Sequence, residues 1–229
     1  MYSSINCLFS QSRKEINLLS VNGVEISKLS YLPIGYDKKQ FPKVNLSLER
    51  EYDFCFSVPY FEKYQNPHYF NRKEIKLIEY LACKFSFEGF KVLLIGKGWN
   101  ESSSISSSKC KYMNIKYEEK SEFLSKVKIF LNLSSYEGGP VTVLEAASSG
   151  CNIISRDVGI TFDLSCDISN CYLINDSDNY AEWYKRILEI KENLKLITQT
   201  EYENNLNILE TKYEFNALAK VIYERMYLK

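Results

Sequence analysis

The stretch 136-YEGGPVTVLEAASSG-150 decides how the rest of the chain is interpreted. It follows the apolar run 128-KIFLNLS-134 and precedes a second apolar run, 151-CNIIS-155. This order of apolar run, glycine-rich turn, helical pattern and apolar run is typical of two parallel strands joined by a helical crossover. The turn before the helix then lies at the carboxyl end of a strand, where ligands bind in open α/β sheets.

Pro140 and Gly150 mark the ends of the predicted helix. Pro140 suits the first helical position because the N–H that it lacks would be unpaired there, and Gly150 suits the left-handed position after the last turn. The first turn leaves N–H groups unpaired beside Gly138 and Gly139, whose missing side chains permit close approach. The sequence therefore predicts a site for an anion such as a diphosphate at this helix start.

Glu137 and Glu145 flank the predicted anion site. Glu145 lies just over one helical turn past Pro140, so both carboxylates can face the same crevice. A carboxylate there can accept two hydroxyls at once, as a ribose or another sugar diol presents them. Two glutamates at an arbitrary place would more often be a turn residue and an exposed helix charge, but the Gly-Gly-Pro turn and the strand-to-helix context favour a binding site.

The rest of the chain continues the alternation of strand and helix. Between residues 52 and 174 we expect four or five strands in a parallel, doubly wound, Rossmann-like sheet of the α/β class. The Ser-rich segment 99-WNESSSISSSKCK-111 is expected to be a mobile loop. After Asp178 the chain is expected to be helical almost to its end. Before residue 52 we expect a strand at 5–9, a helix ending at Gly23, a strand within 28–35 and a polar linker at 37–49.

The composition of the 229 residues is that of an ordinary globular protein, with 45% hydrophobic and 25% charged residues. Lys plus Arg and Asp plus Glu both total 29, so no overall basic charge attracts nucleic acid. The seven cysteines include no C-x-x-C pair, which favours scattered thiols in a reducing cytosol over a zinc site or a disulfide framework. No apolar run approaches the roughly 18 residues of a membrane helix, and no basic region precedes the first apolar patch. We therefore expect a cytoplasmic protein, with a peripheral position at the inner membrane face left open.

At this point the sequence resembles a known family. The segment 134-SSYEGGPVTVLEAASSGCNIIS-155 is similar to the signature of retaining glycosyltransferases with the GT-B fold, glycosyltransferase family 4. The segment 6-NCLFSQSRKEINLLSVNGVEISKLSYLPIGYDKKQF-41 resembles the family's interdomain connection, which ends in a P-x-G-x-D-x-x-x-F pattern. Segments 92-VLLIGKGWN-100 and 213-YEFNALAKVIYERMYL-228 resemble its G-x-G loop and closing helix. The resemblance covers essentially the whole chain.

The resemblance implies a role for each residue of the predicted site. Glu137 would lie near the transferred sugar of a nucleotide-sugar donor, and Glu145 would hold ribose hydroxyls. Gly96 and Gly98 would line the nucleotide pocket, although by itself this G-x-G would be only a tight turn. The diphosphate would be held by four consecutive residues: Gly138, Gly139, Pro140 and Val141. We expect no cofactor and no metal, because the carboxylates form no D-x-D cluster; the nucleoside-diphosphate sugar is the donor substrate.

The family also has an Arg and a Lys, five residues apart, after the first strand of this domain, where they neutralise the leaving diphosphate. Aligned on that strand, Lys63 takes the place of the Lys, and Val58 stands where the Arg is expected. We expect Arg72 and Lys73, at the start of the next helix, to supply the missing charge and stabilise the leaving group. The alternative is a solvated helix start, although a cation is unfavourable at that end of a helix.

Three further residues are candidates for the rim of the site. His68, in the same loop, is a candidate donor to phosphate or sugar, although a single histidine in a loop more often has no such role. Asp157 and Gly159 fall in the loop that follows a strand of the family and are candidates for the rim of the donor pocket.

The resemblance divides the chain into three parts. Residues 1–50 would be a remnant of the N-terminal acceptor domain with the interdomain linker, 51–205 the nucleotide-sugar-binding domain, and 206–229 a C-terminal helix. GT-B enzymes react in the cleft between two Rossmann-like domains. Catalysis would therefore need an acceptor domain from a partner chain, a split gene or a longer parent protein.

Three functions follow as hypotheses. The first is the donor-binding half of a retaining hexosyltransferase, which moves sugar to a carbohydrate or lipid-linked acceptor in surface polysaccharide or glycolipid synthesis, without nucleic acid as a partner. The second is a nucleotide-sugar-binding module without turnover of its own, docked on a separate acceptor-domain chain. The third is a nicotinamide-dependent Rossmann protein, which is disfavoured because no G-x-G-x-x-G follows the first strand.

Overall fold

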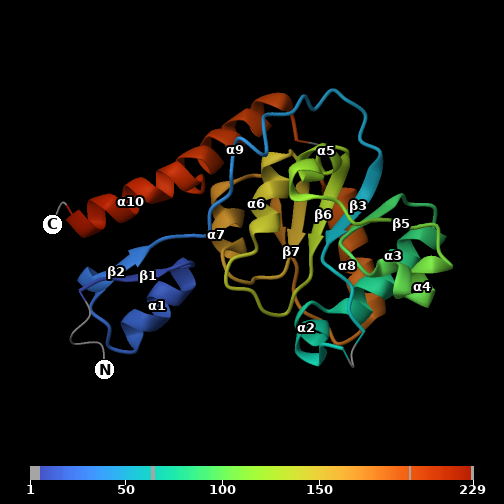
Figure 1. Ribbon diagram of the computed structural model, residues 1–229, viewed down its shortest axis with the longest axis horizontal. Coiled ribbons are helices and arrows are strands. Elements are labelled where there is room, and N and C mark those ends of the chain that lie inside the picture. The colour runs from blue at the N-terminus through green and yellow to red at the C-terminus, as the bar shows by residue number, and fades with distance from the viewer. Residues whose placement is uncertain (1–5, 63–64, 196, 228–229) are drawn as a thin grey trace.

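The computed structural model describes residues 6–62, 65–195 and 197–227. A small N-terminal unit lies beside a larger body built on one sheet (Figure 1). The N-terminal unit has two parallel strands that pair from Leu8 with Leu29 to Ser10 with Tyr31. Its elements are β1 (Leu8–Ser10), α1 (Arg13–Val21), η1 (Ile26–Lys28) and β2 (Leu29–Tyr31).

Six parallel strands form the central sheet in the order β5-β4-β3-β6-β7-β8. The chain runs from β3 outward to β4 and β5 and then returns to β6 on the other side of β3, so the strand order reverses between β3 and β6. In a doubly wound sheet this reversal opens a crevice at the carboxyl ends of the two strands. The strands are β3 (Tyr52–Ser57), β4 (Val92–Ile95), β5 (Lys111–Met113), β6 (Val127–Asn132), β7 (Asn152–Ser155) and β8 (Cys171–Leu173).

The predicted Rossmann-like parallel sheet is confirmed, but it has six strands where four or five were expected. The missed strand, β5, begins in the segment 99–111 that was predicted to be a mobile loop. That segment also holds η2 (Trp99–Glu101) and α4 (Ser103–Ser106). Trp99 is fully buried and its Nε1 donates to the carbonyl of Val58 at 2.8 Å, while the Ser102 hydroxyl caps the N–H of Ile105 at 3.2 Å. The prediction was wrong because a buried tryptophan and a capping serine order this part of the chain.

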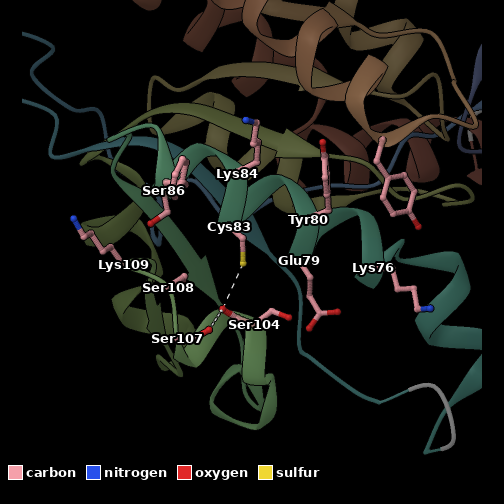
Figure 2. Close-up of a pocket in the computed structure, with 12 residues that line it drawn as sticks. Lys76, Glu79, Tyr80, Cys83, Lys84, Ser86, Ser104, Ser107, Ser108 and Lys109 are labelled. Atoms are coloured by element: carbon pink, nitrogen blue, oxygen red, sulfur yellow. Dashed lines mark hydrogen bonds between the residues drawn. The ribbon is translucent and has the colours of Figure 1, made fainter.

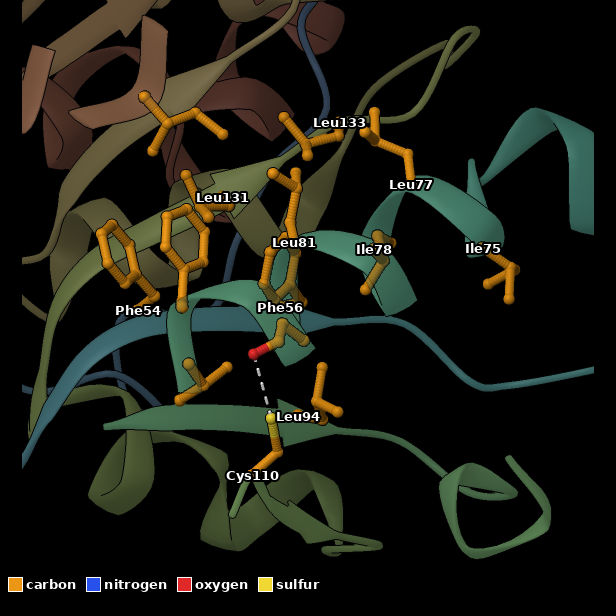
Figure 3. Close-up of a cluster of buried hydrophobic side chains, with 14 of the residues drawn as sticks. Phe54, Phe56, Ile75, Leu77, Ile78, Leu81, Leu94, Cys110, Leu131 and Leu133 are labelled. Carbon is orange, nitrogen blue, oxygen red and sulfur yellow. Dashed lines mark hydrogen bonds between the residues drawn. The ribbon is translucent and has the colours of Figure 1, made fainter. Parts of the chain in front are cut away.

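Helices cover both faces of the sheet, and each face has its own hydrophobic core. Side chains alternate along a strand, so Phe54 and Phe56 face one core and Cys55 faces the other. Phe54 stacks on Phe85 of α3 with ring centroids 4.1 Å apart, and Figure 3 shows this core between the strands and α3. The first face carries α2 (Pro67–Arg72), α3 (Ile75–Phe87), α4 and α8 (Tyr180–Asn193). The second carries α5 (Lys120–Leu124), α6 (Val141–Ser148), α7 (Thr161–Asp167) and α9 (Gln199–Lys212), with η3 (Tyr117–Glu119) before α5.

The helix α6 lies close to its predicted position. Pro140 is the N-cap residue rather than the first helical residue, so the predicted start was one residue too early. Gly150 follows the C-cap residue with a φ of +76°, which confirms the predicted left-handed end of the helix. The loop between β6 and α6 therefore has the strand-to-helix geometry that the sequence indicated.

The region after Asp178 is helical, as predicted, but it forms three helices within the described residues. The predicted closing helix at 206–229 combines the end of α9 with a separate helix, α10 (Phe215–Tyr227). The break lies at Tyr213, where the carbonyl accepts from the N–H of Tyr36 at 3.0 Å. In Figure 1, α10 leaves the body and extends over the N-terminal unit.

Several polar contacts attach the N-terminal unit to the rest of the chain. The Arg225 side chain of α10 donates to the Ser30 hydroxyl at 2.5 Å and to the carbonyl of Leu29 at 3.1 Å. The N–H of Arg13, at the start of α1, donates to the carboxylate of Asp163 in α7 at 2.9 Å. These contacts bring the loop after β1 to the carboxyl edge of the central sheet. Within the part of the chain that the structure describes, every helix is too short or too polar to span a lipid bilayer.

Candidate binding site at the carboxyl edge of the sheet

Glu137, in the loop after β6, forms ion pairs with two cations that follow β3. One carboxylate oxygen lies 3.0 Å from a guanidinium nitrogen of Arg72, and the other is paired with the ammonium of Lys73. The Glu137 side chain is 10% exposed, so the carboxylate is mostly removed from water. The structure thus brings together three of the predicted site residues at the reversal of strand order between β3 and β6.

The two cations lie at a different helix end from the one expected. They were predicted at the start of a helix, but Arg72 ends α2 and Lys73 is its C-cap residue. This short helix was missed in the sequence. Cations at a helix C-terminus are favourable because the unpaired carbonyls there carry partial negative charge. The carbonyl of Arg72 also accepts from the N–H of Ser135 at 2.9 Å, which fixes α2 to the loop after β6.

Two other residues of this segment, Lys63 and His68, were predicted as candidates for the site. Lys63 lies outside the described residues. His68 is an exposed residue of α2. Arg72 and Lys73 are therefore the cations that the structure places beside Glu137.

The glycines of the loop are in contact with other parts of the protein. A Cβ atom on Gly139 would lie 2.7 Å from the Cβ of Ile34 and 3.0 Å from the side-chain oxygen of Gln11. A Cβ atom on Gly159, which has a φ of +56°, would lie 2.4 Å from the carbonyl oxygen of Gly138. The missing side chains thus permit close approach, as predicted, but the groups that approach on the Cβ side belong to the N-terminal segment and the loop after β7.

The first turn of α6 begins without a side-chain cap. Pro140 provides no side-chain cap, and the N–H of Val143 is paired with the carbonyl of Pro140 at 3.0 Å. This positive end of the helix follows Glu137 in the same loop. The loop also contains Ser135, whose N–H donates to the carbonyl of Arg72. An anion at this position would be favoured by both the helix terminus and the two cations.

Glu145 lies in the interior of the protein, at 2% exposure. Its carboxylate is paired with the ammonium of Lys120, the first residue of α5, whose side chain is 13% exposed. The pKa of the nearby Tyr117 is raised to about 12. Burial is the largest cause, and the negative charge of Glu145 is the second. In this structure the two glutamates thus have separate cationic partners. Lys120 could not be recognised from the sequence, because its pairing depends on how α5 packs on α6.

Gly96 and Gly98, in the loop after β4, pack against the loop after β3. A Cβ atom on Gly96 would lie 2.3 Å from the carbonyl oxygen of Val58, and one on Gly98 would lie 2.5 Å from that of Tyr60. The φ angles of the two glycines are +146° and +89°. Both residues are thus required by the tight packing of two loops at the carboxyl edge, which is the tight-turn role considered for them from the sequence.

Asp157, a candidate for the rim, is paired with Lys14 of α1 at 2.9 Å, so it joins the N-terminal unit to the loop after β7. The preceding residue, Arg156, was not predicted from the sequence. Its side chain is 9% exposed and pairs with Glu74 at 2.9 Å. The available sequence signal was an arginine directly after the apolar run 151–155, but its partner lies 82 positions away in the chain.

A hollow of about 980 Å³ lies elsewhere, between α3 and α4 (Figure 2). Lys76, Tyr80, Cys83 and Ser107 are among the residues that line it, and among the described residues none of its lining side chains is a predicted site residue. Among the described residues, no group of three His, Cys, Asp or Glu is arranged to hold a metal ion.

Comparisons with known proteins agree with the fold. A family model described as "Glycosyl transferases group 1" matches residues 38–206. No curated protein sequence matches the chain.

Several solved structures have the same fold at low sequence identity. Sucrose-phosphate synthase from Thermosynechococcus elongatus is 16% identical with a TM-score of 0.70 over 97% of this chain and 58% of that chain. The lipopolysaccharide outer core galactosyltransferase WaaB, in its apo form, is 14% identical with a TM-score of 0.70 over 97% and 62%. Anabaena HepE in complex with UDP is 11% identical with a TM-score of 0.70 over 98% and 64%. The chain therefore has the Rossmann-like half of a GT-B fold with a helical C-terminal tail, and it spans about three fifths of the length of these structures.

Replacing Gly98 by alanine is expected to destabilise the protein more than replacing Gly89. Both glycines have nearly the same left-handed φ, +89° and +90°, but a Cβ atom would meet the carbonyl of Tyr60 only at Gly98. Both variants therefore lose a similar free energy of unfolding from the left-handed backbone. In G98A the collision should add about 1–3 kcal/mol to that loss. Urea unfolding of the two variants measures the difference; equal losses would show that the loop after β3 moves freely.

Replacing Lys120 by methionine is expected to lower the free energy of unfolding by about 3–5 kcal/mol, because Glu145 would remain buried without a partner. The double variant K120M/E145Q should recover much of that loss. The matched control is K126M, since Lys126 pairs with Glu122 at the surface, where such pairs contribute about 0.3–0.5 kcal/mol. Urea unfolding tests the comparison, and equal losses in K120M and K126M would contradict the pairing of Glu145.

Proposed function

Because the chain belongs to the glycosyl transferases of group 1, we propose that it is the donor-binding half of an enzyme that transfers a sugar from a nucleoside-diphosphate donor. We further propose that the reaction retains the configuration of the sugar, as in glycosyltransferase family 4, and that the sugar is a hexose. The division into 1–50, 51–205 and 206–229 is part of this proposal, with the donor site in the middle segment.

The observation that carries the proposal is the ion-pair cluster of Glu137 with Arg72 and Lys73. Two cations and one carboxylate leave a net positive charge beside the first turn of α6. A leaving nucleoside diphosphate develops negative charge as the bond to the sugar breaks, and fixed cations next to it lower the energy of that step. No metal ion or cofactor has a part in the proposal.

The remaining residues take roles around this centre. Glu137 lies near the transferred sugar, and Arg72 and Lys73 bind the diphosphate together with the loop from Gly138 to Val141. Glu145 accepts ribose hydroxyls, which requires Lys120 to exchange its partner when the donor binds, because Glu145 is 2% exposed in this structure. Gly96 and Gly98 keep the loops after β3 and β4 close together at the edge of the nucleotide pocket.

The acceptor in this proposal is a carbohydrate or a lipid-linked sugar of a surface polysaccharide or glycolipid. The reaction would take place in the cytoplasm or at the inner face of the membrane. The acceptor domain is supplied either by further sequence or by a partner chain. The complex of HepE with UDP makes UDP the first nucleotide to test.

A nucleotide-sugar-binding module without turnover is the second candidate. GT-B enzymes react between two Rossmann-like domains, and the described residues form one such sheet plus a two-stranded unit. Such a module would bind the donor at the same residues and dock on a separate acceptor-domain chain. Donor binding without transfer to any acceptor, measured by calorimetry and product analysis, would favour the module.

A thermal-shift screen with UDP, GDP, ADP and their sugars tests donor binding. One of these ligands is expected to raise the unfolding temperature, because a ligand that binds only the folded state stabilises it by about 2.7 kcal/mol at 100 times its Kd. Inorganic phosphate and the free nucleosides are the controls. If no nucleotide shifts the transition, the proposed function is wrong.

The variant E137Q is expected to lose most transfer or donor hydrolysis while binding the nucleoside diphosphate at least as tightly as the wild type. The amide keeps the size of the side chain but removes the negative charge that competes with the diphosphate for Arg72 and Lys73. The control is E192Q, at an exposed position near the end of α8. Calorimetry and a turnover assay measure both quantities; unchanged turnover in E137Q would contradict the role of Glu137.

A further inference from the structure

Glu74, between α2 and α3, has a backbone conformation that is unusual for its residue type. Its φ is +55° and its ψ is +44°, which places it in the left-handed region. Among the described residues it is the one non-glycine residue with a positive φ. A side chain makes this conformation unfavourable, so neighbouring structure must hold it in place. Glycine would adopt it without strain, so the presence of a carboxylate here suggests a function.

The group that holds Glu74 is the buried guanidinium of Arg156. A terminal nitrogen of Arg156 donates to the Glu74 carboxylate at 2.9 Å. The guanidinium also lies 4.7 Å from the ring centre of Trp183, and its Nε is 2.7 Å from a carboxylate oxygen of Asp176, in ion-pair contact without hydrogen-bond geometry. Three groups from three segments therefore converge on the Arg156 side chain.

Arg156 itself is fixed by the central sheet. It follows β7 directly, and its N–H donates to the carbonyl of Asn132 at the end of β6, at 3.1 Å. Its carbonyl accepts from the hydroxyl of Thr161 at 2.6 Å. The position of the guanidinium is thus set by the carboxyl ends of β6 and β7, so the position of Glu74 is set by them as well.

The turn at Glu74 divides three consecutive side chains between two partners. Arg72 and Lys73 reach Glu137 in the loop after β6, whereas Glu74 reaches Arg156 after β7. The carbonyl of Arg72 is held in addition by the N–H of Ser135. If the Glu74 side chain were released, the turn would keep its backbone hydrogen bonds but lose its contact with the end of β7, and the direction of the two cations would be less restricted.

We propose that Arg156 is a positioning residue that acts through Glu74: it holds the turn between α2 and α3 in the conformation in which Arg72 and Lys73 face the diphosphate of the donor. This inference rests on the proposed function. Arg156 does not contact the donor in this proposal, because its guanidinium is buried and already paired with Glu74 and Asp176.

Calorimetry with UDP and uridine tests the proposal, with GDP and guanosine or ADP and adenosine in their place if thermal shifts select another base. The variants R156M and E74Q are expected to lose about tenfold in affinity for the diphosphate and to keep the affinity of the wild type for the nucleoside. R156K, which keeps the charge, is expected to recover part of the loss. K185M, on the exposed side of α8, is the control and should bind both ligands as the wild type does.

The variant E74G separates positioning from stability. Glycine relieves the left-handed strain, so E74G is expected to stay folded. It is nevertheless expected to lose affinity for UDP while keeping its affinity for uridine. Because Arg156 acts through Glu74, adding R156M to E74G should cause no further loss of UDP affinity, and E74G itself serves as a check if R156M alone does not fold.

The outcomes distinguish the inference from the proposed function. If the wild type binds no nucleoside diphosphate, the proposed function fails and the positioning role fails with it. If the wild type binds UDP and E74Q or R156M binds it equally well, only the positioning role is wrong. A further loss of UDP affinity when R156M is added to E74G would show that Arg156 contacts the ligand directly, which would also overturn the proposal. A loss of uridine affinity equal to the loss of UDP affinity would indicate general damage to the pocket and would contradict it.

Discussion

The ion pairs of Glu137 with Arg72 and Lys73 are the interaction on which the rest of the site depends. They join the connections after β3 and after β6, which are the two strands between which the order of the sheet reverses. A doubly wound sheet always has such a reversal, but a bare reversal is only a crevice. Here a carboxylate at 10% exposure and two cations at the C-terminus of α2 lie at this reversal.

The packing around this cluster explains several features of the chain that have no direct chemical role. The glycines of the loops after β4 and β6 allow backbone segments to approach one another where a Cβ atom would collide. The strained turn at Glu74 directs one carboxylate to Arg156 while its neighbours reach Glu137. In our proposal, the contact of Glu74 with Arg156 restricts the direction of Arg72 and Lys73, which precede Glu74 in the chain. A binding site for a diphosphate benefits from such restriction, because cations that are already oriented need little reorganisation when charge develops.

The sequence predicted the architecture better than it predicted the partners of individual side chains. The Rossmann-like sheet could be predicted from the long apolar runs and from Pro140 and Gly150, which mark the ends of α6. The short strand β5 was missed because Ser-rich composition was interpreted as mobility, whereas Ser102 caps a helix there. Lys120 and Arg156 were missed because their partners lie 25 and 82 positions away, and no local pattern records such a pairing. Arg72 and Lys73 were predicted at the start of a helix, whereas in the structure they lie at the end of α2.

In the proposed function, a nucleoside diphosphate binds between the first turn of α6 and the cations that end α2. Amide chemical shifts in a ¹⁵N-labelled sample, recorded during a titration with the nucleoside diphosphate that stabilises the protein, test it most directly. The largest changes are expected at Arg72, Lys73 and the loop from Gly138 to Val141, with little change along the hollow between α3 and α4. Shifts centred on that hollow, with none in the loop after β6, would contradict it.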